Sequence, residues 1–262
     1  MAAHDIVLPG QAERHGIIGT TRTGKSCHLD WEMRGRQEAR PDDMQLLVDT
    51  KPRFRAEVER GWTGPKSRQN AAWRYQDWAK GPVLPNSVLV PLWDDHPFRG
   101  LWQRPGEIAV MQSGDPADWV RMLTLMKRFT RAHIGGRTRH VTVDEILDFY
   151  GRTTHSIQSK NDVFYEIARS GGERMIGETL GAQRVHAIPI MIRNSLSRLT
   201  LYQTSEAKEV GYLSANGIPD ARPPAERFVF YQWQKEPGGK FGKPFKGTLE
   251  LPEEYLAQLS AA

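Results

Sequence analysis

The stretch that most constrains this chain is Gly-Ile-Ile-Gly-Thr-Thr-Arg-Thr-Gly-Lys-Ser at residues 16 to 26. Within it, Gly19, Gly24, Lys25 and Ser26 fit the pattern G-x-x-x-x-G-K-[ST]. A short apolar run that predicts a buried strand comes before the loop, and a predicted helix (27–36) follows it. Such a loop turns successive backbone N–H groups toward an anion at a helix N-terminus. The pattern therefore predicts a nucleoside-triphosphate site.

The residue types in this loop predict separate duties toward ATP and Mg²⁺. We expect the Lys25 amine to reach the β- and γ-phosphates, and the Ser26 hydroxyl to take one place on Mg²⁺. The remaining loop residues are expected to contact the nucleotide through their backbone. The expected binding set is Gly19, Thr20, Thr21, Arg22, Thr23, Gly24, Lys25, Ser26 and Cys27.

A second predicted strand, His-Val-Thr-Val at 140–143, ends in Asp144 and Glu145. ATP hydrolysis with Mg²⁺ needs two carboxylates with different duties. Asp144, at the strand tip, is expected to hold the Mg²⁺ shell opposite Ser26. Glu145 is expected to polarise the attacking water as a general base. An acidic pair at a strand end is by itself a weak indication of an ATPase site. Its position downstream of a phosphate loop makes the indication specific.

A third segment, residues 168–184, reads as a helix that ends near Gly171 and Gly172, followed by a short strand through Leu180. That strand would deliver Gln183 to the edge of the sheet where ligands bind. A neutral amide at this place senses the γ-phosphate or the lytic water without adding charge. An ordinary glutamine at a strand end is the alternative.

The order of predicted elements is strand, helix, strand, helix, which predicts an α/β fold with a mostly parallel sheet and helices on both faces. The 262 residues suffice for one such core. Pro219, Pro223 and Pro224 mark a linker, and an alternating segment (228–233) that turns at Pro237-Gly238-Gly239 predicts a small C-terminal β-hairpin. We therefore expect an ATPase domain over 1–218, and a linker, hairpin and tail over 219–262.

Composition excludes several other classes. Cys27 is the only cysteine, so neither disulfides nor a zinc-cysteine cluster is expected. No apolar run approaches the roughly 18 residues that span a bilayer, and the N-terminus lacks the regions of a signal peptide. A cytoplasmic location is the resulting expectation. The net charge of +5 is compatible with a polyanionic partner without proving one.

Two basic segments leave alternatives open. Residues 53–82 interleave arginines and lysines with tryptophans, which suits contact with a nucleic acid, although an amphipathic helix that covers the sheet is the favoured interpretation. The C-terminal hairpin carries a basic excess, which suits DNA, a neighbouring subunit or a solvated edge equally well.

Together these motifs resemble the FtsK–HerA superfamily of P-loop motor ATPases, especially its viral genome-packaging branch. The resemblance covers about residues 14–204 and rests on the phosphate loop, the Asp49-Thr50-Lys51-Pro52 stretch, the strand that ends in Glu145, and the stretch from Arg169 to Arg184. It implies a RecA-like core, a homo-oligomeric ring (pentamer or hexamer), and double-stranded DNA pumped through the pore. It also implies an ATP site at each subunit boundary, completed by an arginine supplied in trans. Arg169 is the first candidate for that arginine, Arg174 the second, and Arg184 the third.

The sequence therefore predicts an ATP-hydrolysing DNA translocase that packages a phage genome, with a portal or capsid vertex protein as a possible partner. Three rivals remain. A conjugative or segregation-type translocase and a morphogenesis ATPase of the filamentous-phage type normally carry membrane segments. A nucleotide-gated structural or signalling module has no need of Glu145 as an efficient base.

Overall fold

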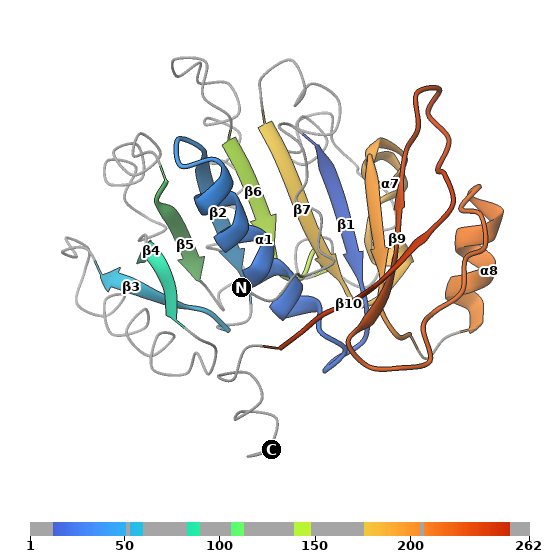
Figure 1. The fold of residues 1–262 in the computed structure, drawn as a ribbon, viewed down its shortest axis with the longest axis horizontal. Coiled ribbons are helices and arrows are strands. Elements are labelled where there is room, and N and C mark those ends of the chain that lie inside the picture. Colours follow the sequence, from blue (N-terminus) through green and yellow to red (C-terminus); the bar gives the residue numbers. More distant parts are fainter. Residues whose placement is uncertain are drawn as a thin grey trace.

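A computed structural model describes residues 13–50, 53–59, 83–89, 106–112, 139–147, 176–204 and 207–251. The strands of these residues form one ten-stranded sheet in the order β10-β9-β8-β1-β7-β6-β2-β5-β4-β3 (Figure 1). The strands are β1 (Arg14–Ile18), β2 (Met44–Asp49), β3 (Arg55–Glu59), β4 (Val83–Leu89), β5 (Ile108–Gln112), β6 (Arg139–Val143), β7 (Ile176–Ala182), β8 (Arg198–Leu201), β9 (Val229–Gln234) and β10 (Phe245–Thr248). The described helices are α1 (Lys25–Ala39), α7 (Ile190–Ser195) and α8 (Ala207–Ala215), with a 3₁₀ turn η1 (Val185–Ala187).

Every pair of neighbours from β8 across to β3 runs parallel, whereas β9 and β10 run antiparallel. Parallel strands present their carboxyl ends at one edge of the sheet, where open α/β folds bind their ligands. The predicted fold, a mostly parallel sheet with flanking helices and a C-terminal hairpin, is therefore confirmed.

The core has two layers, one on each face of the sheet. In β2 the side chains of Leu46 and Val48 belong to one buried cluster, and that of Leu47 belongs to the other. This alternation is the period of two expected of a strand. Leu29 and Met33 of α1 pack with Leu47, so α1 covers one face and leaves its first turn at the ligand-binding edge.

The strand β3 (Arg55–Glu59) is a correction to the sequence analysis, which favoured an amphipathic helix for residues 53–82. Arg55 and Ala56 pair with β4, so the start of this segment forms the edge of the sheet. A local charge pattern carries no information about an edge pairing, which depends on β4 being next to β5. The rest of the 53–82 segment and both Arg169 and Arg174 lie outside the described residues, so the predictions made for them stay predictions.

The C-terminal hairpin is hydrogen-bonded to the core sheet. Strand β9 pairs with β8, and Leu199 lies opposite Trp233, whose ring is fully buried. The β8–β9 pairing joins the two predicted parts in one sheet, and the division of the chain at residue 218 stays a prediction. Among the described helices, none has the length and apolar character that a membrane crossing requires.

Candidate nucleotide site

The phosphate loop joins β1 to α1, and β1 lies between β7 and β8. Its start is held by backbone hydrogen bonds from Gly19 N to Ala182 O (3.0 Å) and from Thr20 N to Gln203 O (3.2 Å). The Thr23 hydroxyl closes the loop by donating to Thr20 O at 2.8 Å. The loop is therefore fixed to both neighbouring strands.

Gly24 meets a backbone requirement at the N-terminus of α1. Its φ is 112°, in the left-handed region that glycine tolerates best. A Cβ at this position would also come within 3.0 to 3.2 Å of Leu249, Phe228 and Tyr202. No side chain caps α1 and no acidic residue lies in its first turn, so the first amides of the helix are suited to an anion.

Lys25 and Glu145 meet in the interior, although 120 residues separate them in the sequence. The Lys25 amine donates to Glu145 Oε2 at 3.0 Å, and the two side chains are 5% and 1% exposed. Burial lowers the pKa of the Lys25 amine, and the Glu145 carboxylate opposes that shift. The predicted phosphate-binding cation and the predicted general base therefore lie together.

Asp144 follows β6 and has one oxygen committed to the end of β2. The backbone amide and the hydroxyl of Thr50 both donate to Asp144 Oδ1 at 2.8 Å. The second oxygen, Oδ2, is buried without a hydrogen bond from the described residues and lies 3.8 Å from Arg53 Nε. Burial raises the pKa of Asp144, while Arg53, the Thr50 hydrogen bonds and Lys25 lower it.

The backbone of β7 approaches Asp144 closely because residue 181 is glycine. A Cβ on Gly181 would lie 2.3 Å from Asp144 O. The amide of Ile146 donates to Gly181 O at 2.8 Å, which ties the turn after β6 to β7. Gly181 was not singled out from the sequence, because its requirement comes from a strand that is distant in the chain.

These residues fit a magnesium ion. The ion prefers oxygen ligands at octahedral positions and is held through one or two protein groups plus phosphate oxygens. Asp144 Oδ2 and Ser26 Oγ are oxygen donors at this edge, and Arg53 contacts both of them. Ser26 and Asp144 therefore fit the role of Mg²⁺ ligands, and that assignment stays a prediction.

Gln183 lies immediately after β7 and is half-buried. Its backbone N–H donates to Glu145 Oε1 at 3.4 Å, so the two residues are neighbours. Arg184 is exposed beside it. The candidate trans arginines Arg169 and Arg174 lie outside the described residues, and their assignment stays a prediction.

The structure adds Arg53, which the sequence analysis placed within a basic segment without assigning it to the site. Arg53 Nη1 donates to Ser26 Oγ at 2.6 Å. A signal was present, because Arg53 follows the polar stretch after β2, at the edge where ligands gather. Nothing in the local sequence distinguishes it from the other basic residues nearby.

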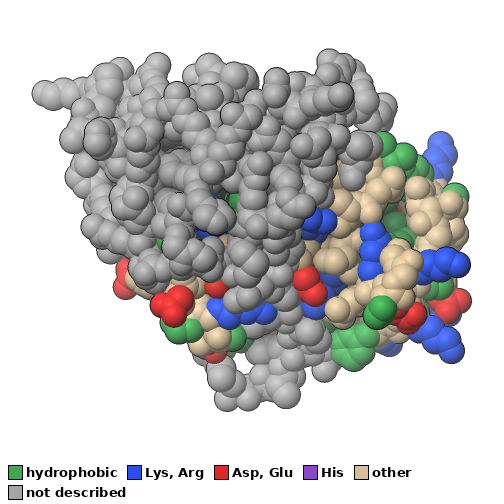
Figure 2. All heavy atoms as spheres, turned by 90° about the horizontal axis from the view of Figure 1, so that it is seen from above, with side chains coloured by type: hydrophobic (Ala, Val, Ile, Leu, Met, Phe, Trp, Pro, Cys, Tyr) green, Lys and Arg blue, Asp and Glu red, His purple; other side chains and the backbone are tan. Residues whose placement is uncertain are grey.

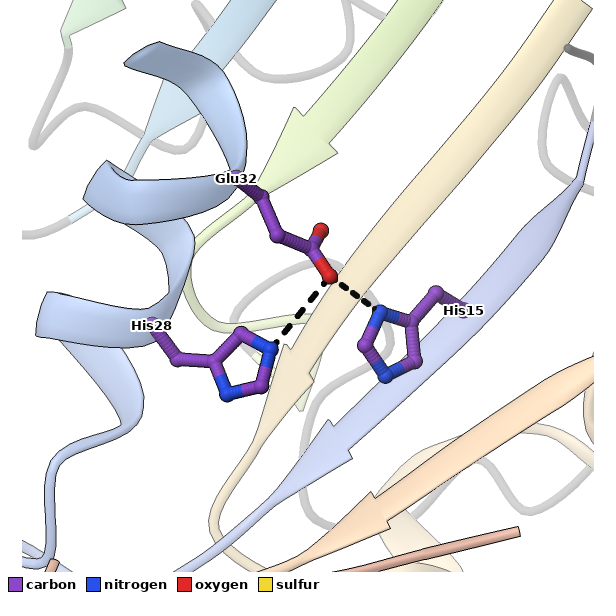
Figure 3. Close-up of side chains that lie close together, drawn as sticks. All are labelled: His15, His28 and Glu32. Carbon is purple, nitrogen blue, oxygen red and sulfur yellow. Dashed lines mark hydrogen bonds and ion pairs between the residues drawn. The ribbon is translucent and has the colours of Figure 1, made fainter. Parts of the chain in front are cut away.

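Behind the loop, His15, His28 and Glu32 form a buried cluster between β1 and α1 (Figure 3). Glu32 Oε1 lies 2.5 Å from His15 Nδ1 and 3.4 Å from His28 Nε2. Thr179 donates to the other Glu32 oxygen at 2.9 Å, and the Tyr202 hydroxyl lies 2.7 Å from His28 Nδ1. His15 Nδ1 and Glu32 Oε1 lie within hydrogen-bonding distance, so the cluster fits a hydrogen-bonded support for α1 better than a metal site.

The surface of the described residues carries mixed charge. Figure 2 shows Lys and Arg side chains on the side formed by α8 and the hairpin, with acidic and hydrophobic side chains among them. The exposed basic residues of the hairpin and its approach are Arg222, Arg227, Lys240, Lys243 and Lys246. This surface fits a polyanion, a neighbouring subunit or a solvated edge, as the sequence did.

The sheet order and the loop after β1 define a P-loop nucleoside-triphosphatase fold, and comparison with solved structures agrees. B204, the DNA-packaging ATPase from Sulfolobus turreted icosahedral virus, superposes with a TM-score of 0.55 at 13% identity, over 94% of this chain and 100% of that one. B204 from Sulfolobus turreted icosahedral virus 2, in complex with ATP-gammaS, gives 0.57 at 12% identity, over 90% and 98%.

A bacterial protein shares the fold as well. EssC (ATPases 2 and 3) from Geobacillus thermodenitrificans gives a TM-score of 0.54 at 12% identity, over 95% of this chain and 43% of the EssC chain. No family model and no curated protein sequence matches this chain. The predicted resemblance in fold to a genome-packaging ATPase is therefore confirmed by the likeness to B204.

Proposed function

We propose that this protein hydrolyses ATP to translocate double-stranded DNA, and that it packages a viral genome into a procapsid. The observation that carries the proposal is the meeting of Lys25, Asp144 and Glu145 at one edge of a parallel sheet. A phosphate-binding cation, a metal ligand and a general base are the parts that phosphoryl transfer to water requires. The likeness in fold to the B204 packaging ATPase supports DNA as the polymer that the protein moves.

The chain's own residues perform positioning and charge stabilisation. The loop amides and Lys25 bind the phosphates, and Glu145 orients the attacking water and accepts its proton. A bound Mg²⁺, held by Ser26 and Asp144, supplies neutralisation of the charge on the phosphate oxygens. The backbone N–H of Gln183 donates to Glu145 Oε1, which places Gln183 beside the base, and its side-chain amide senses whether the γ-phosphate is present.

Lys25 must exchange its partner during this cycle. Its amine donates to Glu145, and a γ-phosphate offers a more highly charged acceptor. When Lys25 moves to the phosphate, Glu145 loses a direct cation and becomes free to accept a proton from water. The approach of the nucleotide thus releases the base that hydrolyses it.

The assembly that we propose is a ring of five or six identical subunits, with an arginine from the neighbour, Arg169 or Arg174, completing each site. A portal or capsid vertex protein is the proposed docking partner, and the host cytoplasm the proposed location. A conjugative or segregation-type DNA translocase, the alternative, would use the same chemistry to move DNA in another process.

The deciding experiment compares ATPase rates with and without double-stranded DNA, using Glu145→Gln as the inactive control. We expect DNA to stimulate hydrolysis by the unmodified chain and to leave the Glu145→Gln rate at background. If DNA does not change the rate of ATP hydrolysis, the protein is an ATPase but not a DNA translocase. Nucleotide binding without turnover would instead favour a nucleotide-gated module.

A further inference from the structure

Arg53 is held in place at its backbone. The amides of Arg53 and Phe54 both donate to Asp49 Oδ2, at 2.8 and 3.0 Å, and the Phe54 ring is buried. Asp49 is the last residue of β2, next to β6 in the sheet. These two hydrogen bonds hold the backbone of Arg53 and Phe54 against the end of β2, at the carboxyl edge of the sheet.

The guanidinium of Arg53 reaches the two side chains that would hold Mg²⁺. Its Nη1 donates to Ser26 Oγ at 2.6 Å, and its Nε lies 3.8 Å from Asp144 Oδ2. The Asp144 carboxylate is fully buried, and the Arg53 side chain is 31% exposed. A guanidinium is always charged and presents several N–H donors in a fixed plane, so it can neutralise Asp144 while bonding Ser26.

We propose that Arg53 competes with the divalent cation for Ser26 and Asp144, so that metal enters the site together with nucleotide and displaces the guanidinium. This inference rests on the proposed function. Two cations cannot share these oxygens, because like charges a few ångströms apart in a buried site repel strongly. The phosphates of ATP bring the extra negative charge that lets Mg²⁺ replace Arg53.

The arrangement has a consequence for the protein without nucleotide. Arg53 donates to Ser26 Oγ and lies 3.8 Å from Asp144 Oδ2, so its guanidinium stands where a metal ion would contact both oxygens. The site without nucleotide therefore binds free divalent cations poorly. Metal binding therefore depends on whether nucleotide is bound.

The test measures Mn²⁺ binding to the full chain by the loss of the electron paramagnetic resonance signal of free Mn²⁺, without nucleotide and with ATP-gammaS. Arg53→Met removes the charge and keeps most of the stem. We expect it to bind Mn²⁺ at least tenfold more tightly than the unmodified chain when nucleotide is absent. With ATP-gammaS the difference should narrow to less than threefold.

Arg34→Met is the matched control. Arg34 is 27% exposed and pairs with the buried Asp30 at 2.8 Å, away from Ser26 and Asp144. Its Mn²⁺ affinity should equal that of the unmodified chain. In an Asp144→Asn background, Arg53→Met should no longer change Mn²⁺ binding, because the carboxylate for which the two cations compete is gone. Arg53→Lys, which keeps the charge, should stay within threefold of the unmodified chain, and it reports on the charge even if Arg53→Met does not fold.

An Mn²⁺ affinity that is unchanged or weaker in folded Arg53→Met would overturn the competition. So would an Arg53→Lys chain that binds free Mn²⁺ tenfold more tightly. Binding of a fluorescent ATP analogue to the unmodified chain is measured in parallel. If that chain binds no nucleotide, the proposed function fails, while the Mn²⁺ titration without nucleotide still judges Arg53.

Discussion

The amine of Lys25 lies 3.0 Å from Glu145 Oε2, and both side chains are buried. The phosphate loop and the end of β6 thus meet through one charged hydrogen bond. Any change at either residue acts on catalysis and on a buried ion pair together. Stability must therefore be measured beside activity for both.

For Glu145→Gln we expect nucleotide binding within a fewfold of the unmodified chain and a loss of turnover of about 10²–10⁴. The amide still accepts from Lys25 but is a poor base. Binding of a fluorescent ATP analogue and phosphate release under single-turnover conditions separate the two effects. Hydrolysis at the unmodified rate would show that Glu145 is not the base.

Lys25→Ala is expected to lose nucleotide binding and also to destabilise the fold, because Glu145 is left buried and charged. Breaking a buried ion pair by removal of one partner costs about 3–5 kcal/mol. Urea unfolding of Lys25→Ala and of the Lys25→Ala/Glu145→Gln double variant measures this term. The double variant should recover part of the loss, and equal stability of the two would contradict the account.

Gly24→Ala should distort the phosphate loop. A side chain at φ 112° costs about 1–2 kcal/mol, and its Cβ would meet Leu249 and Phe228. Gly211→Ala is the control, because Gly211 lies within α8 and a Cβ there meets nothing within 4 Å. Alanine at 211 should stabilise the protein by roughly 0.5–1 kcal/mol. Thermal melts and nucleotide titrations of both variants check the contrast.

Acidification should destabilise the protein from below about pH 6.5. Burial holds the pKa of His140 well below its usual value of 6.5, so the unfolded chain binds this proton first and stability falls as the pH falls. Glu32 acts in the same direction at lower pH. Burial raises its pKa, but the pairing with His15 prevails and holds that pKa well below 4.5, so its contribution is present above 4.5 and lost below.

Melting temperatures between pH 8 and pH 4 test this prediction, with His140→Gln as the comparison. Glutamine can donate to the Thr179 hydroxyl, which His140 Nε2 contacts at 2.8 Å, and it does not titrate. We expect a shallower pH dependence in this variant, by up to ~1.4 kcal/mol per pH unit in the affected range. A melting temperature that rises on acidification would contradict the sign.

Mixing experiments test the arginine supplied in trans. Arg169→Ala should bind ATP and hydrolyse it about 10³–10⁵ more slowly. Mixed with Lys25→Ala, it should regain activity, since one interface pairs an intact Lys25 with an intact Arg169. If the mixture of Lys25→Ala with Arg174→Ala regains activity and the mixture with Arg169→Ala does not, the arginine supplied in trans is Arg174. Mixed rings that form without any recovery would argue against a shared site.

The phosphate loop, the helix after it and the acidic pair after β6 could all be predicted from the sequence. These are local features, because the loop conformation depends on Gly24 and a few consecutive residues, and a strand that ends in Asp144 and Glu145 can be read from its pattern. The parallel sheet also followed, since alternating strands and helices leave few other ways to bury both faces.

The contacts between these residues depend on how the strands are arranged in the folded protein. Lys25 meets Glu145, and Arg53 meets Ser26 and Asp144, because β1, β7, β6 and β2 lie side by side with their carboxyl ends at one edge. Strand order is set by packing over the whole core, and no short motif encodes it. For the same reason, Arg53 could not be distinguished from the other basic residues in the sequence. The need for glycine at position 181, where β7 passes close to the backbone of Asp144, is visible only in the folded sheet.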